Sequence, residues 1–251
     1  MKNARPRPVT ETAESENLPG AKARLSIIIP VLDEASGIVA ILQRLQPLRA
    51  QGAEIIVADG GSSDASRTLA EPLADLVLTS PRGRGRQMNT GAAAGQGPVL
   101  LFLHADTLLP ANAMEAILLA IRRGAAWGRF DVRIDGSACG LGLIAFMMNW
   151  RSRLSGIATG DQAIFVTRAA FEQAGGFLDI PLMEDVAFSS RMRRLTKPAC
   201  LRMKVLTSGR RWEKNGVVTT ILNMWRLRLR FSLGANPTDL ARDYGYSPRD
   251  H

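Results

Sequence analysis

Cysteine and histidine are scarce in this chain, whose 251 residues include only two of each. The two cysteines, Cys139 and Cys200, lie far apart and belong to no CxxC pattern or Cys/His cluster. This excludes a disulfide framework and a Cys/His zinc site. It indicates reduced thiols without a special role, as in a cytoplasmic protein.

Long apolar segments are missing as well. The longest one, residues 138–150, is shorter than the about 20 residues that a membrane-spanning helix needs. Residues 1–20 are polar and contain no apolar segment of the kind found in signal peptides. We therefore expect a cytoplasmic protein that is at most peripheral to the inner face of a membrane.

Aromatic residues make up only 6% of the chain, and no helix-turn-helix, zinc-finger or RNA-binding signature is present. Nucleic acid is therefore not expected as a partner, despite a net charge of +9. The positive charge is concentrated, because residues 191–230 contain 12 Lys and Arg and a single acid, Glu213. This concentration favours an anionic substrate or an anionic lipid surface, and a solvated basic face is the alternative.

Two common nucleotide-binding motifs are absent. No GxxxxGK[ST] sequence occurs, which excludes a P-loop NTPase. No GxGxxG follows the first apolar run, and the RGRGR sequence at residues 82–86 lacks that spacing, which argues against a dinucleotide-dependent dehydrogenase.

Short apolar runs that alternate with helical patterns dominate the first half of the chain. Each run is rich in Val, Ile and Leu and reads as a strand that is covered on both faces; the runs are residues 25–30, 54–58, 75–80 and 99–104. Helical patterns follow each of them, the second from about Ser63 and the third after an arginine- and glycine-rich loop. Such alternation predicts a doubly wound, parallel α/β sheet.

The second half has a different character. It predicts an antiparallel strand at residues 127–135 and a helix at residues 138–150. A further strand is predicted at residues 162–168, and after it a short helix at residues 168–177 that is closed by Gly175 and Gly176. Residues 1–23 lack apolar periodicity and are expected to be a disordered tail. With no repeat and no linker, residues 24–251 are expected to form a single domain.

Charged side chains follow all four predicted parallel strands. In an open α/β sheet these strand ends meet at one edge, where ligands bind. Carboxylates there can accept hydrogen bonds from ribose or base and can hold a divalent cation, whereas guanidinium groups bind phosphates. Any single carboxylate could simply cap a loop. Together they describe a site for a nucleoside diphosphate with Mg²⁺ or Mn²⁺, and the residues concerned are Asp33, Glu34, Asp59, Asp64, Arg82, Arg84, Arg86, His104 and Asp106.

Five stretches, in this order, resemble family 2 glycosyltransferases of the GT-A fold: SIIIPVLDEASGI, IIVADGGSSDAS, FLHADT, GDQAIFVTRAAFEQAGGF and PLMEDVAFSSRMRR. The resemblance covers about residues 25–195 and is greatest to small stand-alone bacterial members. It implies a nucleotide-binding half at about residues 24–125 and an acceptor-side half, helical and antiparallel, at about residues 126–251. The implied activity is inverting, metal-dependent transfer of a sugar from a nucleoside-diphosphate donor to a hydroxyl acceptor.

The resemblance also implies roles for the strand-end residues. Pro30, Asp33 and Glu34 match the opening motif that cradles the nucleotide, and Asp59 matches the aspartate that reads base or ribose. Arg84 and Arg86 would stabilise the charge of the leaving diphosphate.

The HAD sequence, His104-Ala105-Asp106, stands where this family has its DXD metal motif, so Asp106 is the implied metal ligand. His104 departs from that motif. It could be a ligand for a softer ion such as Mn²⁺, cap the strand or contact ribose.

On the acceptor side, Asp185 resembles the catalytic base, and the adjacent Glu184 is the second candidate. Both acids could instead stabilise the beginning of a helix. Asp161 could bind acceptor hydroxyl groups or cap its loop.

The C-terminal arginine- and leucine-rich segment, which the resemblance implies is helical, could form with residues 138–150 a basic-rimmed apolar surface. Such a surface suits a lipid-linked acceptor or peripheral membrane contact, and ordinary core packing is the alternative.

Two other functions remain open at this point. A sugar-phosphate nucleotidyltransferase has a similar fold, but its glycine-rich signature would follow the first strand, where this chain has VLDEASG. A non-catalytic protein that binds nucleotide sugars or a membrane surface is the third possibility, supported only by His104.

Overall fold

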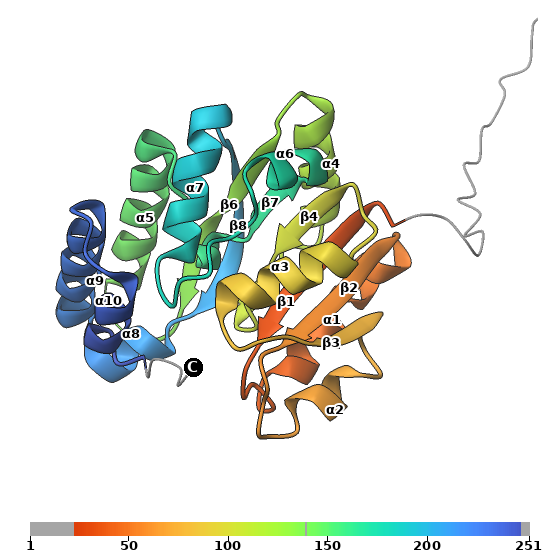
Figure 1. Cartoon of the computed structure of the whole chain (residues 1–251), viewed down its shortest axis with the longest axis horizontal. Coiled ribbons are helices and arrows are strands. Elements are labelled where there is room, and N and C mark those ends of the chain that lie inside the picture. The colour runs from red at the N-terminus through yellow and green to blue at the C-terminus, as the bar shows by residue number, and fades with distance from the viewer. Residues whose placement is uncertain (1–22, 139, 247–251) are drawn as a thin grey trace, which may run out of the picture.

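The computed structural model describes residues 23–138 and 140–246 (Figure 1). The tail predicted for residues 1–23, except Ala23, and Cys139 lie outside these ranges. The structure contains one eight-stranded sheet, whose strands are β1 (Leu25–Val31), β2 (Ala53–Asp59), β3 (Leu76–Thr79), β4 (Val99–Phe102), β5 (Thr107–Leu108), β6 (Trp127–Asp135), β7 (Ile164–Thr167) and β8 (Ala199–Ser208).

The sheet has the strand order β3-β2-β1-β4-β7-β6-β8-β5. Its first four strands are parallel, whereas β7 is antiparallel to both β4 and β6, and β5 is antiparallel to β8. The predicted doubly wound, mostly parallel sheet with an antiparallel acceptor-side portion is confirmed. Strand β6 is antiparallel only toward β7, because it pairs in parallel with β8 on its other edge.

The helices are α1 (Ile38–Ala50), α2 (Ser66–Ala70), α3 (Arg84–Ala94), α4 (Ala113–Arg122), α5 (Leu141–Ser155), α6 (Arg168–Gln173), α7 (Glu184–Leu195), α8 (Arg210–Asn215), α9 (Val217–Ser232) and α10 (Pro237–Asp243), with a 3-10 turn η1 (Gly160–Gln162). Helix α2 begins at Ser66 and not near Ser63. The arginine-rich segment is not a loop beyond Arg84, since α3 already begins there. The alternating Arg/Leu segment is helical, as the family resemblance implies.

Two apolar layers sandwich the sheet, one on each face. Strand β1 shows the alternation: Ile27 and Ile29 pack with α1, α4 and α5, whereas Ile28 packs with α3, α6 and α7. All three isoleucines are fully buried. Helices therefore cover both faces of the sheet (Figure 1), and in such a fold ligands bind at the carboxyl ends of the strands.

Helix α3 lies unusually close to β1, and glycine at position 91 is what permits this. A Cβ atom at Gly91 would lie 2.4 Å from Ile28 Cγ2, which belongs to a stiff, β-branched side chain in the core. We expect Gly91→Ala to lower the free energy of unfolding by about 1–2 kcal/mol, as overpacking does.

Thermal and urea denaturation would measure the effect of Gly91→Ala. Gly142→Ala is the matched control, because Gly142 lies in α5 and a Cβ atom there would have no neighbouring atom within 4 Å. This control should gain about 0.5–1 kcal/mol from helix propensity alone. Equal stabilisation by both substitutions would contradict the close packing of α3 on β1.

Candidate functional site

A cavity of about 1040 Å³ opens beside the carboxyl ends of β1 and β4. Its other walls come from the beginnings of α3 and α7, from η1, and from α5, α9 and the chain after α10. This volume is at the upper end of the range for small-molecule sites. Of the residues expected at the site from sequence, those that line it are Pro30, Glu34, Arg82, Arg84, His104, Ala105, Asp106, Asp161, Glu184 and Asp185.

Asp33 and Asp59 are not among the residues that line this cavity, because their carboxylates hold a loop together. Asp33 accepts hydrogen bonds from the Ser63 backbone N–H at 2.8 Å and from its hydroxyl at 3.0 Å. Asp59, buried at the end of β2, accepts from the Ser62 hydroxyl at 2.5 Å and from the N–H groups of Gly61 and Ser62 at 3.2 Å. Both carboxylates thus shape the segment between β2 and α2 next to the cavity.

Arg86 does not line the cavity either, although it lies only two residues beyond Arg84. Its guanidinium forms an ion pair with Asp179. Arg84 lines the cavity instead. Gln87, one residue beyond Arg86, fixes the position of α3 beside the cavity. The Gln87 amide donates to the carbonyls of Val31 at 2.7 Å and Ala58 at 2.8 Å, which ties α3 to the ends of β1 and β2.

Arg84 is paired across the cavity wall with Glu184, the first residue of α7. Arg84 Nη1 lies 3.1 Å from Glu184 Oε1, and Glu184 is only 1% exposed. Burial raises the pKa of Glu184, and the Asp185 carboxylate adds to the rise, while Arg84 opposes it. Glu184 is thus committed to an ion pair.

Asp185 has a different environment from its neighbour. Its Oδ2 accepts a hydrogen bond from the Gly160 backbone N–H at 2.8 Å, and its Oδ1 accepts from the Val186 N–H at 2.7 Å. It lies in the first turn of α7, as the alternative interpretation expected, but it also lines the cavity. Both acids therefore begin a helix and contribute to the site, and of the two only Asp185 forms no ion pair within the described residues.

His104 packs against the same loop that holds Asp185. A Cβ atom at Gly160 would lie 2.2 Å from His104 Nε2, so the imidazole needs glycine at this position. Burial lowers the pKa of His104, and the nearby Arg84 charge lowers it further. The imidazole is therefore neutral near pH 7 and makes no side-chain hydrogen bond within the described residues.

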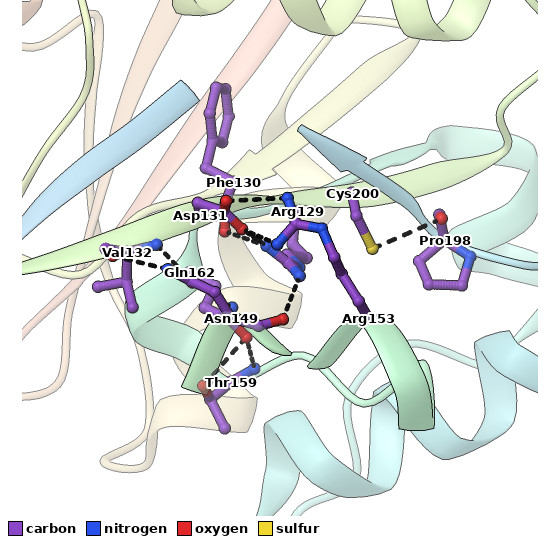
Figure 2. Close-up of polar contacts among 10 residues, drawn as sticks. All are labelled: Arg129, Phe130, Asp131, Val132, Asn149, Arg153, Thr159, Gln162, Pro198 and Cys200. Carbon is purple, nitrogen blue, oxygen red and sulfur yellow. Dashed lines mark hydrogen bonds and ion pairs between the residues drawn. The ribbon is translucent and has the colours of Figure 1, made fainter. Parts of the chain in front are cut away.

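A buried polar network positions the acceptor side of the cavity (Figure 2). Asn149 of α5 donates to the Val132 carbonyl at 3.0 Å and accepts from the Val132 N–H at 2.8 Å, which fixes α5 on β6. Gln162 of η1 accepts from the Thr159 N–H at 3.2 Å. Thr159 in turn donates to Asp161 Oδ1 at 2.5 Å, so part of the Asp161 carboxylate is used within its loop.

Asp131 of β6 anchors two arginines in the same network. Arg153 donates to both of its oxygens, at 2.6 and 2.8 Å, and Arg129 also pairs with it (Figure 2). Arg153 is therefore a structural residue that ties the end of α5 to the sheet. Arg151, two residues earlier, lines the cavity instead.

Several cavity residues carry no clear motif in the sequence. Arg228 and Trp225 of α9, Arg210, Met183 and Tyr246 all line the cavity. The concentration of positive charge at residues 191–230 pointed to the arginines as a group, but no local pattern distinguishes Arg228 from Arg226. Met183, the residue that precedes α7, has a left-handed φ of 69°, which sequence does not reveal for a methionine.

The carboxylates that line the cavity suit a divalent metal that is also bound by a phosphate group. Within residues 23–138 and 140–246, no group of three or more His, Cys, Asp or Glu could hold a metal alone. Asp106 lines the cavity, and its Oδ1 accepts from the Thr107 hydroxyl at 3.2 Å, while its Oδ2 has no hydrogen-bond partner among the described residues. Burial and the Asp106 charge raise the pKa of Glu34, so both carboxylates lie near one another. One or two carboxylates completed by phosphate oxygens suit Mg²⁺ or Mn²⁺.

One protein family matches the chain, and the match covers just over half of its residues. Residues 26–155 match the family described as Glycosyl transferase family 2. A curated relative, the succinoglycan biosynthesis protein ExoA of Rhizobium meliloti (strain 1021), is 47% identical over 62 residues, which cover 22% of this chain and 19% of ExoA.

Solved structures with a similar fold include glucosyl-3-phosphoglycerate synthase from Mycobacterium tuberculosis with Mn²⁺, UDP and glucosyl-3-phosphoglycerate (TM-score 0.60, 14% identity, 91% of this chain and 82% of that one). The mannosyltransferase PcManGT from Pyrobaculum calidifontis with GDP-Man and Mn²⁺ has a TM-score of 0.58 at 18% identity. The match covers 84% of this chain and 61% of PcManGT. TarS from S. aureus with UDP has a TM-score of 0.60 at 15% identity, and the match covers 74% of this chain and 60% of TarS. The chain thus spans less than two thirds of ExoA, TarS and PcManGT, and the structural matches establish the fold.

Proposed function

The chain belongs to glycosyl transferase family 2, and from this premise we propose that it transfers a sugar from a nucleoside-diphosphate donor to a hydroxyl acceptor, with inversion. The observation that carries the proposal is the shared cavity. Asp106, in the turn between β4 and β5, and Asp185 at the beginning of α7 line the same space, although they are far apart in the chain. The cavity is large enough for a nucleotide sugar and an acceptor group.

The donor half of the cavity has the groups that a nucleoside diphosphate requires. Pro30 and Glu34 from the end of β1, together with His104 and Ala105, form the wall against which the nucleotide would lie. Arg84 supplies positive charge for the diphosphate, and Asp106 would hold Mg²⁺ or Mn²⁺. The metal, when bound, supplies charge stabilisation for the leaving diphosphate. Asp33 and Asp59 would act indirectly, by shaping the adjacent loop.

Asp185 is the proposed catalytic base. The acceptor hydroxyl attacks the anomeric carbon, its proton passes to the Asp185 carboxylate, and the bond between that carbon and the diphosphate oxygen breaks. Glu184 is unsuited to this task because its carboxylate already forms an ion pair with Arg84. A single carboxylate base on the acceptor side gives one displacement, and hence inversion. Asp161 would bind acceptor hydroxyl groups with its remaining oxygen.

Residues 24–251 are proposed to act as one transferase domain. Its nucleotide-binding half, at about residues 24–125, contributes the ends of β1 and β4, and its acceptor-side half, at about residues 126–251, contributes η1, α5, α7 and α9. The ExoA similarity is restricted to 62 residues and supports the family alone.

Nucleotide binding tests the proposal before any acceptor is known. UDP, GDP, dTDP and CDP sugars would be screened by thermal shift with Mn²⁺ and with EDTA. We expect one base to stabilise the fold by about 2.7 kcal/mol at a concentration of 100 Kd, and only with the metal. Stabilisation by none of them would contradict the proposal. Slow hydrolysis of the selected donor with Mn²⁺ would distinguish a transferase from a non-catalytic binding protein.

A further inference from the structure

Helices α5 and α9 expose an unusual amount of apolar surface. Each carries five large apolar side chains that are at least 46% exposed, spaced mostly three or four residues apart as on one helix face. They are Leu143, Phe146, Met147, Trp150 and Leu154 on α5, and Val218, Leu222, Trp225, Leu229 and Leu233 on the α9 side, the last of them just after the helix. Exposed apolar area of this kind marks a binding surface for an apolar ligand or a membrane.

The apolar faces continue into the cavity. Ile144, Met147 and Met148 of α5 and Ile221, Met224 and Trp225 of α9 line it. Met147 and Trp225 belong to both the exposed faces and the cavity wall. The two helices stand at the same end of the molecule, on the acceptor side of the sheet (Figure 1). An apolar chain lying between them would therefore lead from the surface to the site.

Two half-buried arginines on the same helices have side-chain nitrogens that are buried in that wall without hydrogen-bond partners among the described residues. Arg151 of α5 and Arg228 of α9 both line the cavity. The Nε and Nη2 atoms of Arg151 and the Nε of Arg228 are inaccessible to solvent and have no hydrogen-bond partner within the described residues. A guanidinium group has only donors, so it needs an acceptor when it is removed from water.

The electrostatics agree with this geometry. Burial lowers the pKa of Arg151 to about 10, and the charge of Arg228 adds to the effect, against the opposing charges of Asp161 and Asp185. Two like charges therefore share a desolvated wall close to the proposed catalytic base. An anion bound between them would satisfy the free N–H groups and remove the repulsion.

We infer that Arg151 and Arg228 form a binding subsite for an anionic group of the acceptor, and that its apolar part lies between α5 and α9. The acceptor is thus an amphiphile, an apolar chain that bears a phosphate or carboxylate close to the hydroxyl group presented to Asp185. This inference rests on the proposed function for the identity of the ligand as acceptor. The binding subsite itself does not depend on sugar transfer.

Binding of octyl phosphate below its micellar concentration tests the subsite without any donor present. Calorimetry or the fluorescence of Trp150 and Trp225 would measure it. We expect octyl phosphate to bind at least tenfold more tightly than inorganic phosphate, which lacks the chain, and octyl glucoside, which lacks the charge. Equal affinity for all three would overturn the inference.

Substitution of the arginines tests their role. Arg151→Met and Arg228→Met should each weaken octyl phosphate binding at least tenfold and leave octyl glucoside binding unchanged. Arg226→Met is the matched control, because Arg226 lies on α9 outside the cavity and pairs with Asp243. If one of the variants Arg151→Met and Arg228→Met does not fold, the other alone is sufficient for the test. Unchanged affinity in a folded cavity variant would refute the subsite.

Vesicles distinguish the two sources of such an amphiphile. If it is a membrane lipid, the chain should sediment with vesicles of phosphatidylcholine and phosphatidylglycerol, and Phe146→Ser with Leu229→Ser should abolish this. Octyl phosphate binding without vesicle binding would support the subsite and assign its ligand to a free amphiphile. Loss of nucleotide binding with intact octyl phosphate binding would overturn the proposed transferase activity and leave the subsite standing.

Discussion

Asp185→Asn is expected to reduce sugar transfer about a thousandfold, within the range that a general base contributes, while donor binding stays nearly unchanged. The amide oxygen can still accept the hydrogen bond that the Gly160 N–H now gives to Asp185 Oδ2 at 2.8 Å, while the Val186 N–H loses the acceptor that Oδ1 now provides at 2.7 Å. Thermal denaturation of the variant would measure what that loss costs in stability. What the substitution removes is the capacity to take a proton from the acceptor. Release of nucleoside diphosphate in the presence of acceptor would measure transfer, and thermal shift would measure donor binding.

The neighbouring carboxylate provides the control for this substitution. Glu184→Gln also replaces a carboxylate by an amide, one residue away, but Glu184 is buried and forms an ion pair with Arg84. It should lower the melting temperature, because it leaves the Arg84 charge without its partner, and retain far more transfer than Asp185→Asn. Abolished transfer in Glu184→Gln with normal transfer in Asp185→Asn would reverse the two assignments.

Asp106→Asn should weaken nucleotide binding about a hundredfold when Mn²⁺ is present, since even changes around a metal ligand reach that size. The oxygen without a hydrogen-bond partner among the described residues, Oδ2, is the one available to a metal, and an amide in its place carries no negative charge. Calorimetric titration with the nucleotide selected by thermal shift would measure the affinity.

The same titration in EDTA is the control for Asp106→Asn. Without metal, both proteins should bind the nucleotide weakly, and the variant no more weakly than wild type, because the Asp106 carboxylate then only repels the diphosphate. A variant that keeps its metal-dependent affinity would show that Asp106 is not the metal ligand. His104 would then be the next residue to test, since its neutral imidazole is available near pH 7.

The four parallel strands of the donor half could be predicted from sequence because each strand is a short, continuous apolar run. LSIIIP at the start of the sheet is apolar at every position except Ser26, as a strand covered on both faces requires. Its isoleucines indeed divide between the two apolar layers. The parallel pairing of β6 with β8 could not be predicted, because β8 mixes polar with apolar residues, is partly exposed and depends on a long-range register.

The site could be predicted in part, and the limits have a physical origin. Position relative to a strand end indicated Glu34, His104 and Asp106, which line the cavity. The same criterion indicated Asp33 and Asp59, whose carboxylates are used by Ser62 and Ser63 in a loop. Sequence position shows where a backbone leads, but not whether a nearby hydroxyl group has already taken a carboxylate.

The helical part of the site was harder to predict for a related reason. Arg84 and Arg86 are two residues apart in α3 and point in different directions around it, so only one can face the cavity. In the same way Arg228 lines the cavity, whereas Arg226 pairs with Asp243. Sequence alone could not give the rotation of these helices about their axes, which depends on packing against the sheet.

A crystal structure with the selected nucleotide sugar and Mn²⁺ tests most directly whether the ends of β1 and β4 and the beginning of α7 form one transferase site. The account predicts anomalous signal for Mn²⁺ at coordinating distance from Asp106, with the diphosphate beside Arg84 and the sugar directed toward Asp185. A nucleotide bound elsewhere, or a metal held away from Asp106, would contradict it.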